Sequence, residues 1–153
     1  MDLAEKYPPS EPCSCETCFA YFARPGWWTV EEAYKAFDAG LGMRMMLEAA
    51  PERTFGVVSP AFKGCEGMIA SKKYASNSCT FLTEDMCELF GSGFQPLECH
   101  FCHHTRNGQG VNCHFDLECD WKRPAGRQLV RQLCKLTGIF DLLDAYGLQK
   151  LRK

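Results

Sequence analysis

The sequence predicts a mainly α-helical fold in a single small domain, with at most a small β-hairpin. Apolar residues recur at helical spacing in two parts of the chain, near residue 30 and after residue 126, and the segment between them shows no sustained helical period. A chain of 153 residues is close to the commonest size of one domain and can bury its own core. With 46% hydrophobic and 24% charged residues, its composition is that of an ordinary globular domain.

Charge and hydropathy give no sign of a nucleic-acid partner or of a membrane. The net charge of -2 shows no electrostatic footprint for nucleic acid or for an anionic membrane, and it excludes neither. No apolar run approaches the ~20 residues that cross a bilayer. The first residues, MDLAEKYPPSEP, lack the basic start and the apolar segment of a secretory signal, so the sequence predicts a cytoplasmic protein.

Residues 1–12 are predicted to form a flexible N-terminal arm. Pro8, Pro9 and Pro12 interrupt regular structure there, because proline lacks a backbone N–H group and has a fixed φ angle. Residues 13–153 are predicted to form the single domain, since neither an internal repeat nor a linker divides them.

A helix is predicted to begin at Thr29, because Thr29-Val-Glu-Glu32 has the pattern of a capping box. Gly40 is a natural stop for this helix. The apolar positions that follow at helical spacing are Val30, Ala33, Tyr34 and Phe37. A second short helix is expected from about Leu41 to Ala49, ended by Pro51.

The middle of the chain, residues 55–112, is rich in Gly, Ser, Asn and Pro. CTFL and MCELF, on either side of Thr83-Glu84-Asp85, could pair as a small hairpin. TRNGQGVN, residues 105–112, is typical of a polar loop. Because this segment has little apolar surface to bury, something other than a hydrophobic core should hold it together.

Helix is predicted again at the C-terminal end, over residues 126–151. Leu129, Leu133 and Leu136 recur at helical spacing, and Gly138 breaks the run. A further apolar stripe follows from Ile139 to Leu151.

The eleven cysteines indicate what could hold the middle segment together. An odd cysteine count and a reducing compartment argue against a disulfide scaffold. Thiolates are soft ligands that suit zinc and iron–sulfur clusters. The pairs Cys15-x-x-Cys18 and Cys99-x-x-Cys102 let one turn aim two sulfurs at one ion, and Cys13-x-Cys15 is a looser version. The sequence therefore predicts irregular loops stapled by metal.

Eight cysteines are predicted ligands, enough for two four-coordinate sites. They are Cys13, Cys15, Cys18, Cys65, Cys79, Cys87, Cys99 and Cys102. We expect iron–sulfur clusters of the 4Fe–4S type, because thiols are many and confident histidine ligands are few; zinc is the alternative. Metal binding would supply folding energy to a segment that burial does not stabilise.

Alternatives stay open for the remaining cysteines and for two histidines. Cys134 lies on the apolar face of a helix and is predicted to be a buried core residue. Cys113 and Cys119 could be ligands or not. His103 or His104 could complete a mixed Cys/His site or donate a hydrogen bond to a thiolate.

The stretch CTFLTEDMCELFGSGFQPLEC resembles the second half of the CxxCxxCC (YkgJ-like) family of zinc- or iron-chelating cysteine cluster proteins. That pattern is Cys-x-Phe-Leu, a short turn, Cys-x-Ile/Leu and Pro-x-x-Cys. Here it falls on Cys79, Phe81, Leu82, Cys87, Leu89, Pro96 and Cys99. PCSCETC resembles the family's opening cluster, although Cys18 is followed by Phe19 where the family has a second cysteine. The resemblance covers about residues 13–104 and implies a metal or an iron–sulfur cluster, but no reaction.

The sequence thus predicts a cytoplasmic metal-binding protein with one or two centres, with a redox or electron-transfer role and a protein redox partner. One alternative is an enzyme in which three cysteines hold the metal and substrate takes the fourth position. Another is a zinc-stapled interaction module. The sequence leaves open whether the protein is an enzyme, because an open coordination position is a property of the fold.

Overall fold

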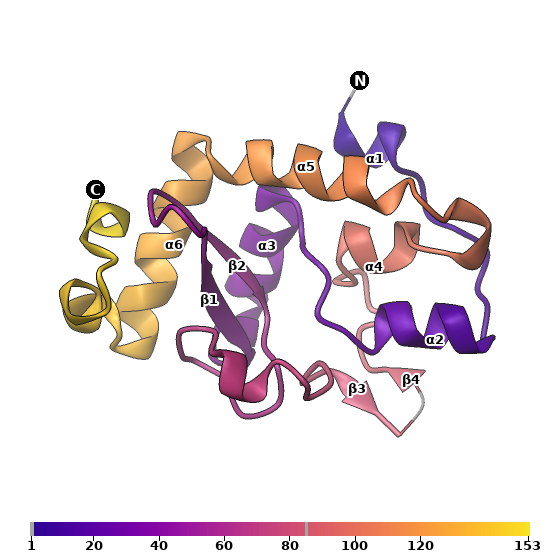
Figure 1. Cartoon of the computed structure of the whole chain (residues 1–153), viewed down its shortest axis with the longest axis horizontal. Helices are drawn as coiled ribbons and strands as arrows, with labels where there is room; N and C mark the ends of the chain where they lie inside the picture. Colours follow the sequence, from indigo (N-terminus) through magenta and orange to yellow (C-terminus); the bar gives the residue numbers. More distant parts are fainter. Residues whose placement is uncertain (1, 85) are drawn as a thin grey trace.

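The computed structural model describes residues 2–84 and 86–153 (Figure 1). Helices predominate, and the strands form two small two-stranded antiparallel sheets, so the predicted fold class is confirmed. Two groups of elements lie side by side (Figure 1). The first group contains α3 (Val30–Ala36), β1 (Met45–Ala49), β2 (Gly56–Pro60) and α6 (Pro124–Thr137). The second contains α1 (Leu3–Lys6), α2 (Glu16–Phe22), β3 (Leu82–Thr83), β4 (Met86–Cys87) and α4 (Leu97–Phe101).

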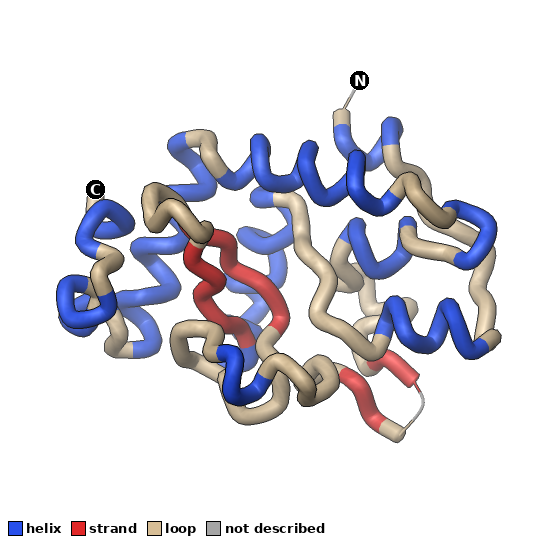
Figure 2. The backbone as a smooth tube through the Cα atoms, viewed as in Figure 1, coloured by secondary structure: helices blue, strands red, loops and turns tan. Residues whose placement is uncertain are grey.

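Helix α5 (Gly110–Trp121) runs along both groups and joins them (Figure 1). The second group contains long stretches of loop between its short elements (Figure 2). Within the described residues, no helix has both the length and the apolar character that crossing a membrane would need.

The largest hydrophobic core lies in the first group, where α6 packs against α3 and the β1–β2 sheet. Leu129 and Leu133 of α6 are buried there, and Cys134 beside them is fully buried, which confirms its predicted role as a core residue. Trp121, at the end of α5, donates its indole N–H to the carbonyl of Trp28 over 2.9 Å. Helix α5 is thereby fastened to this core.

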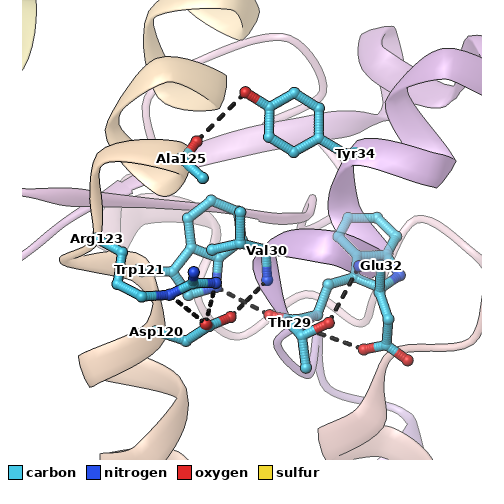
Figure 3. A network of polar contacts seen from close by, with 9 residues as sticks. Thr29, Val30, Glu32, Tyr34, Asp120, Trp121, Arg123 and Ala125 are labelled. Atoms are coloured by element: carbon cyan, nitrogen blue, oxygen red, sulfur yellow. Dashed lines mark hydrogen bonds and ion pairs between the residues drawn. The ribbon is translucent and has the colours of Figure 1, made fainter. Parts of the chain in front are cut away.

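Helix α3 begins at the capping box that the sequence predicts (Figure 3). The Thr29 hydroxyl accepts the N–H of Glu32 at 3.0 Å, and the Glu32 carboxylate accepts the N–H of Thr29 at 2.9 Å. Asp120 of α5 accepts the N–H of Val30 at 2.8 Å and also pairs with Arg123. The start of α3 is therefore tied to the corner between α5 and α6.

The helix predicted from Leu41 to Ala49 is wrong. Gly40 ends the helical backbone with a φ of 94°, and short turns then lead into β1, which pairs with β2 from Ala49↔Gly56 to Met45↔Pro60. Met and Leu favour helices in isolation. Here Met45, Met46 and Leu47 are all fully buried in successive positions, so packing on both faces of the sheet outweighs that preference.

The C-terminal end is less regular than predicted. Gly138, with a φ of 80°, ends α6 as expected. In place of a further continuous helix to residue 151, three 3₁₀ turns follow: Phe140–Leu142, Asp144–Tyr146 and Gln149–Arg152. Gly147 adopts a φ of 70°, which stops helical propagation within this stretch.

Helix α5 is absent from the sequence prediction. It starts at Gly110, inside the expected polar loop, after a 3₁₀ turn at His104–Arg106. Its buried residues are Cys113, Leu117 and Trp121, one for each turn. So narrow an apolar line is a weak helical signal, which is why periodicity alone did not reveal it.

The arm predicted at residues 1–12 makes specific contacts. Its first residues form α1, capped by the Asp2 carboxylate. Tyr7 is buried, and its hydroxyl donates to Asp116 of α5 at 2.5 Å, where Lys6 also pairs at 2.7 Å. The predicted hairpin is present as β3–β4, and Asp85 of its expected turn lies outside the described residues.

Candidate metal centre

The start of α2 gathers three thiols around one point. Cys15 is the N-cap residue of α2, and its sulfur accepts the N–H of Cys18 at 3.4 Å. The N–H of Cys15 in turn points to the sulfur of Cys13 at 3.5 Å. The spacing Cys-x-Cys-x-x-Cys therefore folds into a helix start whose backbone N–H groups face sulfur atoms, an arrangement that stabilises thiolates.

His104 closes this group from a distant part of the sequence. It begins the 3₁₀ turn that follows α4, and its backbone N–H donates to the sulfur of Cys18 at 3.3 Å. Its Nδ1 atom lies 3.6, 3.4 and 3.3 Å from the sulfurs of Cys13, Cys15 and Cys18. The ring of His103 stacks on that of His104 at 4.2 Å, so it helps to fix the orientation of the imidazole.

The four ligand atoms all lie within 4.8 Å of one another, so they could hold one metal ion. Cys18 is buried beneath the group, Cys13 is half-buried, and Cys15 and His104 are exposed. This set of three sulfurs and one imidazole nitrogen is hereafter called the Cys₃His group. It joins the N-terminal segment to the turn after α4.

The thiols of the Cys₃His group differ in acidity. The N–H of Cys18, together with the neighbouring Cys13 and His104, lowers the pKa of the exposed Cys15 to about 7. Burial raises the pKa of Cys18 to about 11. Cys15 therefore forms a thiolate more readily than Cys18, whose thiol would need a bound cation to lose its proton near neutral pH.

A second set of thiols, Cys79, Cys87 and Cys99, lies close together. Burial raises the pKa of Cys99 well above its usual range, and the nearby thiols of Cys79 and Cys87 raise it further. Burial also raises the pKa of Cys79, to about 11, and that of Cys87. Among the described residues, only the Cys₃His group has its ligand atoms close enough together to hold a single ion. The sulfurs of Cys79, Cys87 and Cys99 do not meet that condition.

Nearby backbone N–H groups lower the pKa of the thiols in this second set and so partly offset the effect of burial. Phe81 does so for Cys79, Leu89 and Phe90 do so for Cys87, and Gly26 does so for Cys99. A side chain at Gly26 could not fit, because a Cβ atom there would lie 2.5 Å from the Cys99 sulfur. Cys87 ends β4 of the hairpin, and Cys79 lies three residues before β3, where it pairs with Phe62.

Cys102 lies between the two sets. It follows α4, and burial raises the pKa of its thiol to about 11. It lines a cavity of about 340 Å³ with Cys13 and Cys18 of the Cys₃His group and with Cys87 and Cys99 of the second set. Five thiols thus face one cavity.

The remaining cysteines lie elsewhere. The predicted ligand Cys65 is buried in a small apolar cluster with Met46 and Ala61. Cys113 is buried in the apolar contact between α5 and α4, and Cys119 is exposed on α5. All eleven cysteines are free thiols.

Comparisons with protein families, with curated proteins and with solved structures found no match to this chain. The resemblance to the CxxCxxCC family, and the ligand roles it implies for Cys79, Cys87 and Cys99, stay predictions.

The sequence analysis placed Cys13, Cys15 and Cys18 among the ligands and left His104 as one of two histidines that could complete a mixed site. The structure brings His104, and not His103, to the three sulfurs. The Nδ1 atom of His103 is instead hydrogen-bonded to the backbone N–H of Thr105 at 3.1 Å. The signal for His104 was its position just after a Cys-x-x-Cys pair, and nothing local distinguished it from its neighbour.

Proposed function

We propose that this protein binds a single zinc ion through the Cys₃His group. The carrying observation is the distance from the His104 Nδ1 atom to the three sulfurs, 3.3 to 3.6 Å. Zinc–sulfur and zinc–nitrogen bonds of about 2.3 and 2.0 Å in a tetrahedron place sulfur and nitrogen about 3.5 Å apart. The imidazole nitrogen therefore stands at the spacing from each sulfur that ligands of one tetrahedral ion would have.

This proposal reverses our preference for iron–sulfur at this position. That preference depended on a lack of histidine ligands, and the structure supplies one. A 4Fe–4S cluster binds each thiolate to a different iron, which spaces the sulfurs further apart than ligands of one ion. Three thiolates and one imidazole are a common ligand set of structural zinc sites.

The proposed role of this zinc is structural. Four protein ligands complete the tetrahedron and leave no position for a substrate. The ion would fasten residues 13–18 to His104, across 86 to 91 positions of the sequence. Of the three functions considered, the zinc-stapled interaction module agrees best with this geometry. A cytoplasmic location stays part of the proposal, because thiolate ligands remain reduced there.

Metal analysis of the purified protein tests the first centre. We expect Cys18→Ser and His104→Ala each to contain about one zinc for each chain less than the wild-type protein. Cobalt exchanged into the site should give the visible bands of a tetrahedral ion with thiolate ligands, and His104→Ala should change them. Cys134→Ser is the matched control, since it alters a buried thiol outside the group. Full zinc in His104→Ala, or loss of zinc in Cys134→Ser, would contradict the proposal.

We further propose a second centre at Cys79, Cys87 and Cys99, with Cys102 as the fourth ligand. The supporting observation is that the first three thiols are close enough to affect one another's pKa and that nearby backbone N–H groups lower each pKa, which favours thiolates around a metal. Cys102 lines the same cavity as Cys87 and Cys99. A set of thiolates alone suits an iron–sulfur cluster or zinc. An iron–sulfur cluster here would transfer electrons, and the protein would then need a redox partner to exchange them with.

Colour and metal content distinguish the possibilities at the second centre. Protein purified without oxygen should be brown with an iron–sulfur cluster and colourless with zinc. Cys87→Ser and Cys99→Ser should each remove this metal and leave the zinc of the Cys₃His group in place. Cys65→Ser is the matched control for a predicted ligand that the structure places in an apolar cluster. Metal content that is the same in Cys99→Ser and in the wild-type protein would exclude the second centre.

A further inference from the structure

A second hollow, of about 660 Å³, shares Cys99 and Cys102 with the thiol-lined cavity, but its remaining wall is of a different kind. Carboxyl, imidazole, guanidinium and aromatic side chains from five parts of the chain line it, among them Arg24, Trp27, Glu48, Glu98 and His114. A volume of this size is typical of sites for small molecules.

The carboxyl of Glu48, a residue of β1, is a group in this hollow that has no ion-pair partner among the described residues. It accepts a hydrogen bond from the indole N–H of Trp27, and the hollow keeps it partly exposed. Loss of hydration around it raises its pKa. Within the part of the chain that the structure describes, no lysine, arginine or histidine forms an ion pair with Glu48. Among the described residues, the Glu48 carboxyl is thus without a cationic side chain as an ion-pair partner.

The other charged groups of the hollow do not supply that partner. His114 is paired with Glu98, whose carboxylate lies 2.7 Å from the imidazole Nδ1 atom. The same carboxylate also accepts the backbone N–H of Trp27 at 2.9 Å. Arg24 is exposed and makes no ion pair with Glu48 among the described residues. The rings of Trp27 and His114 lie with their centroids 4.0 Å apart, and Trp27 contacts both carboxyls, Glu48 through its indole N–H and Glu98 through its backbone N–H.

We propose that this hollow binds a small organic cation, an ammonium or guanidinium compound, at the Glu48 carboxylate and beside the ring of Trp27. A cation of this kind forms charge-assisted hydrogen bonds with a carboxylate. It is also attracted to the face of an aromatic ring, most strongly to tryptophan. A metal ion is a poorer match. The ligand atoms of the Cys₃His group all lie within 4.8 Å of one another, and those of Glu48, Glu98 and His114 do not form such a group.

A titration followed by NMR tests this directly, with n-butylammonium and butylguanidinium as probes. The indole N–H resonance of Trp27 is the reporter, assigned by its loss in Trp27→Phe. The other two indoles are internal references, since Trp28 and Trp121 are fully buried and donate to backbone carbonyls. We expect a saturable shift of the Trp27 resonance with the two cations, and none with 1-butanol or butyrate at equal concentration.

Variants test the part that Glu48 plays. Glu48→Gln should weaken binding of n-butylammonium about tenfold or more, because it removes a hydrogen bond to a charged acceptor. Glu52→Gln, a change at an exposed turn residue, should leave binding unchanged. Zinc content should be equal in both variants, which separates this result from the Cys₃His proposal.

Several results would overturn the proposal. An equal response to 1-butanol would make the hollow an apolar pocket, and a response to butyrate alone would make it an anion site at Arg24. Retained affinity in a folded Glu48→Gln variant, or no saturable shift in the wild-type protein, would refute it as well. The comparison of cations with their neutral analogue uses only the wild-type protein, so it decides the question even if Glu48→Gln fails to fold.

Discussion

Cys15 and Cys18 are three residues apart, yet their thiols have opposite surroundings. Cys15 is exposed at the start of α2 and accepts a backbone N–H, which lowers its pKa to about 7. Cys18 is buried, which raises its pKa to about 11. A helix start that exposes one sulfur and buries another therefore produces one reactive thiol and one inert thiol within a single turn.

This difference predicts the order in which thiols of the metal-free protein are alkylated. At about pH 7.5, iodoacetamide should modify Cys15 well before Cys18, because the thiolate is the reacting form. Added zinc should protect both, and the exposed Cys119 should stay reactive and serve as the control. Mass spectrometry of peptides measures each rate. Equal rates for Cys15 and Cys18 would show that their surroundings are not as described.

At the scale of elements, the short helices depend on their ends. The Glu32 carboxylate that completes the capping box of α3 also accepts the backbone N–H of Leu97, at 3.1 Å, at the start of α4. One side chain thus serves two helices from the two halves of the molecule. Helices this short have little stability of their own, so such contacts determine whether they form.

We expect Thr29→Ala to lower the free energy of unfolding by about 1 kcal/mol, the usual cost of losing an N-cap hydroxyl. Denaturant titration measures this change. Thr29→Ser keeps the hydroxyl that accepts the Glu32 N–H, so its stability should stay close to that of the wild-type protein. If the serine variant were as unstable as the alanine variant, the methyl group and not the cap would be responsible.

The attachment of α1 gives a prediction that depends on pH. The hydrogen bond from Lys6, followed by that from Tyr7, lowers the pKa of Asp116. A carboxyl with a lowered pKa adds stability above its usual pKa of 3.8, and that stability is lost as the pH falls through the lowered value. The arm should therefore stay attached near pH 4 and loosen only below it.

Asp116→Asn should loosen the arm at neutral pH, because the ionised acceptor for Lys6 is lost. The amides of Lys6 and Tyr7, which donate to Asp2 and Leu3, should then exchange hydrogen faster. Asp141→Asn, at an exposed position on the C-terminal turns, is the control. Unchanged exchange at Lys6 and Tyr7 would mean that burial of Tyr7 holds the arm without Asp116.

At the scale of the whole molecule, the metal site and the main core are in different groups of elements. The Cys₃His group ties α2 to the turn after α4, whereas the largest core lies among α3, α6 and the β1–β2 sheet (Figure 1). Helix α5 connects them through Trp121 at one end and Cys113 and Leu117 nearer the other. Stability should accordingly be divided between a part held by burial and a part held by metal.

Chelation of the metal should therefore loosen one half of the molecule. We expect faster hydrogen exchange at Phe19 and Ala23 of α2 and at Gln109, whose amides lie in the segments joined by the Cys₃His group. Amides of α6 and of the β1–β2 sheet should keep their protection. Protection of α2 that survived verified removal of the metal would argue against a structural role for the ion.

Signals that act over a few residues could be recognised in the sequence. The capping box at Thr29, the stop at Gly138, the β3–β4 hairpin and the burial of Cys134 each depend on neighbours within one or two turns. The clustering of Cys13, Cys15 and Cys18 is equally local, because one helix start brings their sulfurs together. The fold class followed from the same short-range patterns.

The tertiary structure decided what depends on distant partners. Met45–Leu47 form a strand because side chains on both faces of the β1–β2 sheet are buried, and this burial outweighs the helical preference of these residues. His104 became the fourth member of the metal group because the turn after α4 comes back to α2. The hollow beside Glu48 joins β1, α4 and α5 in the same way. Spacing along a chain reports only which side chains share a turn or a face, whereas a ligand set and a cavity depend on where separate segments pack.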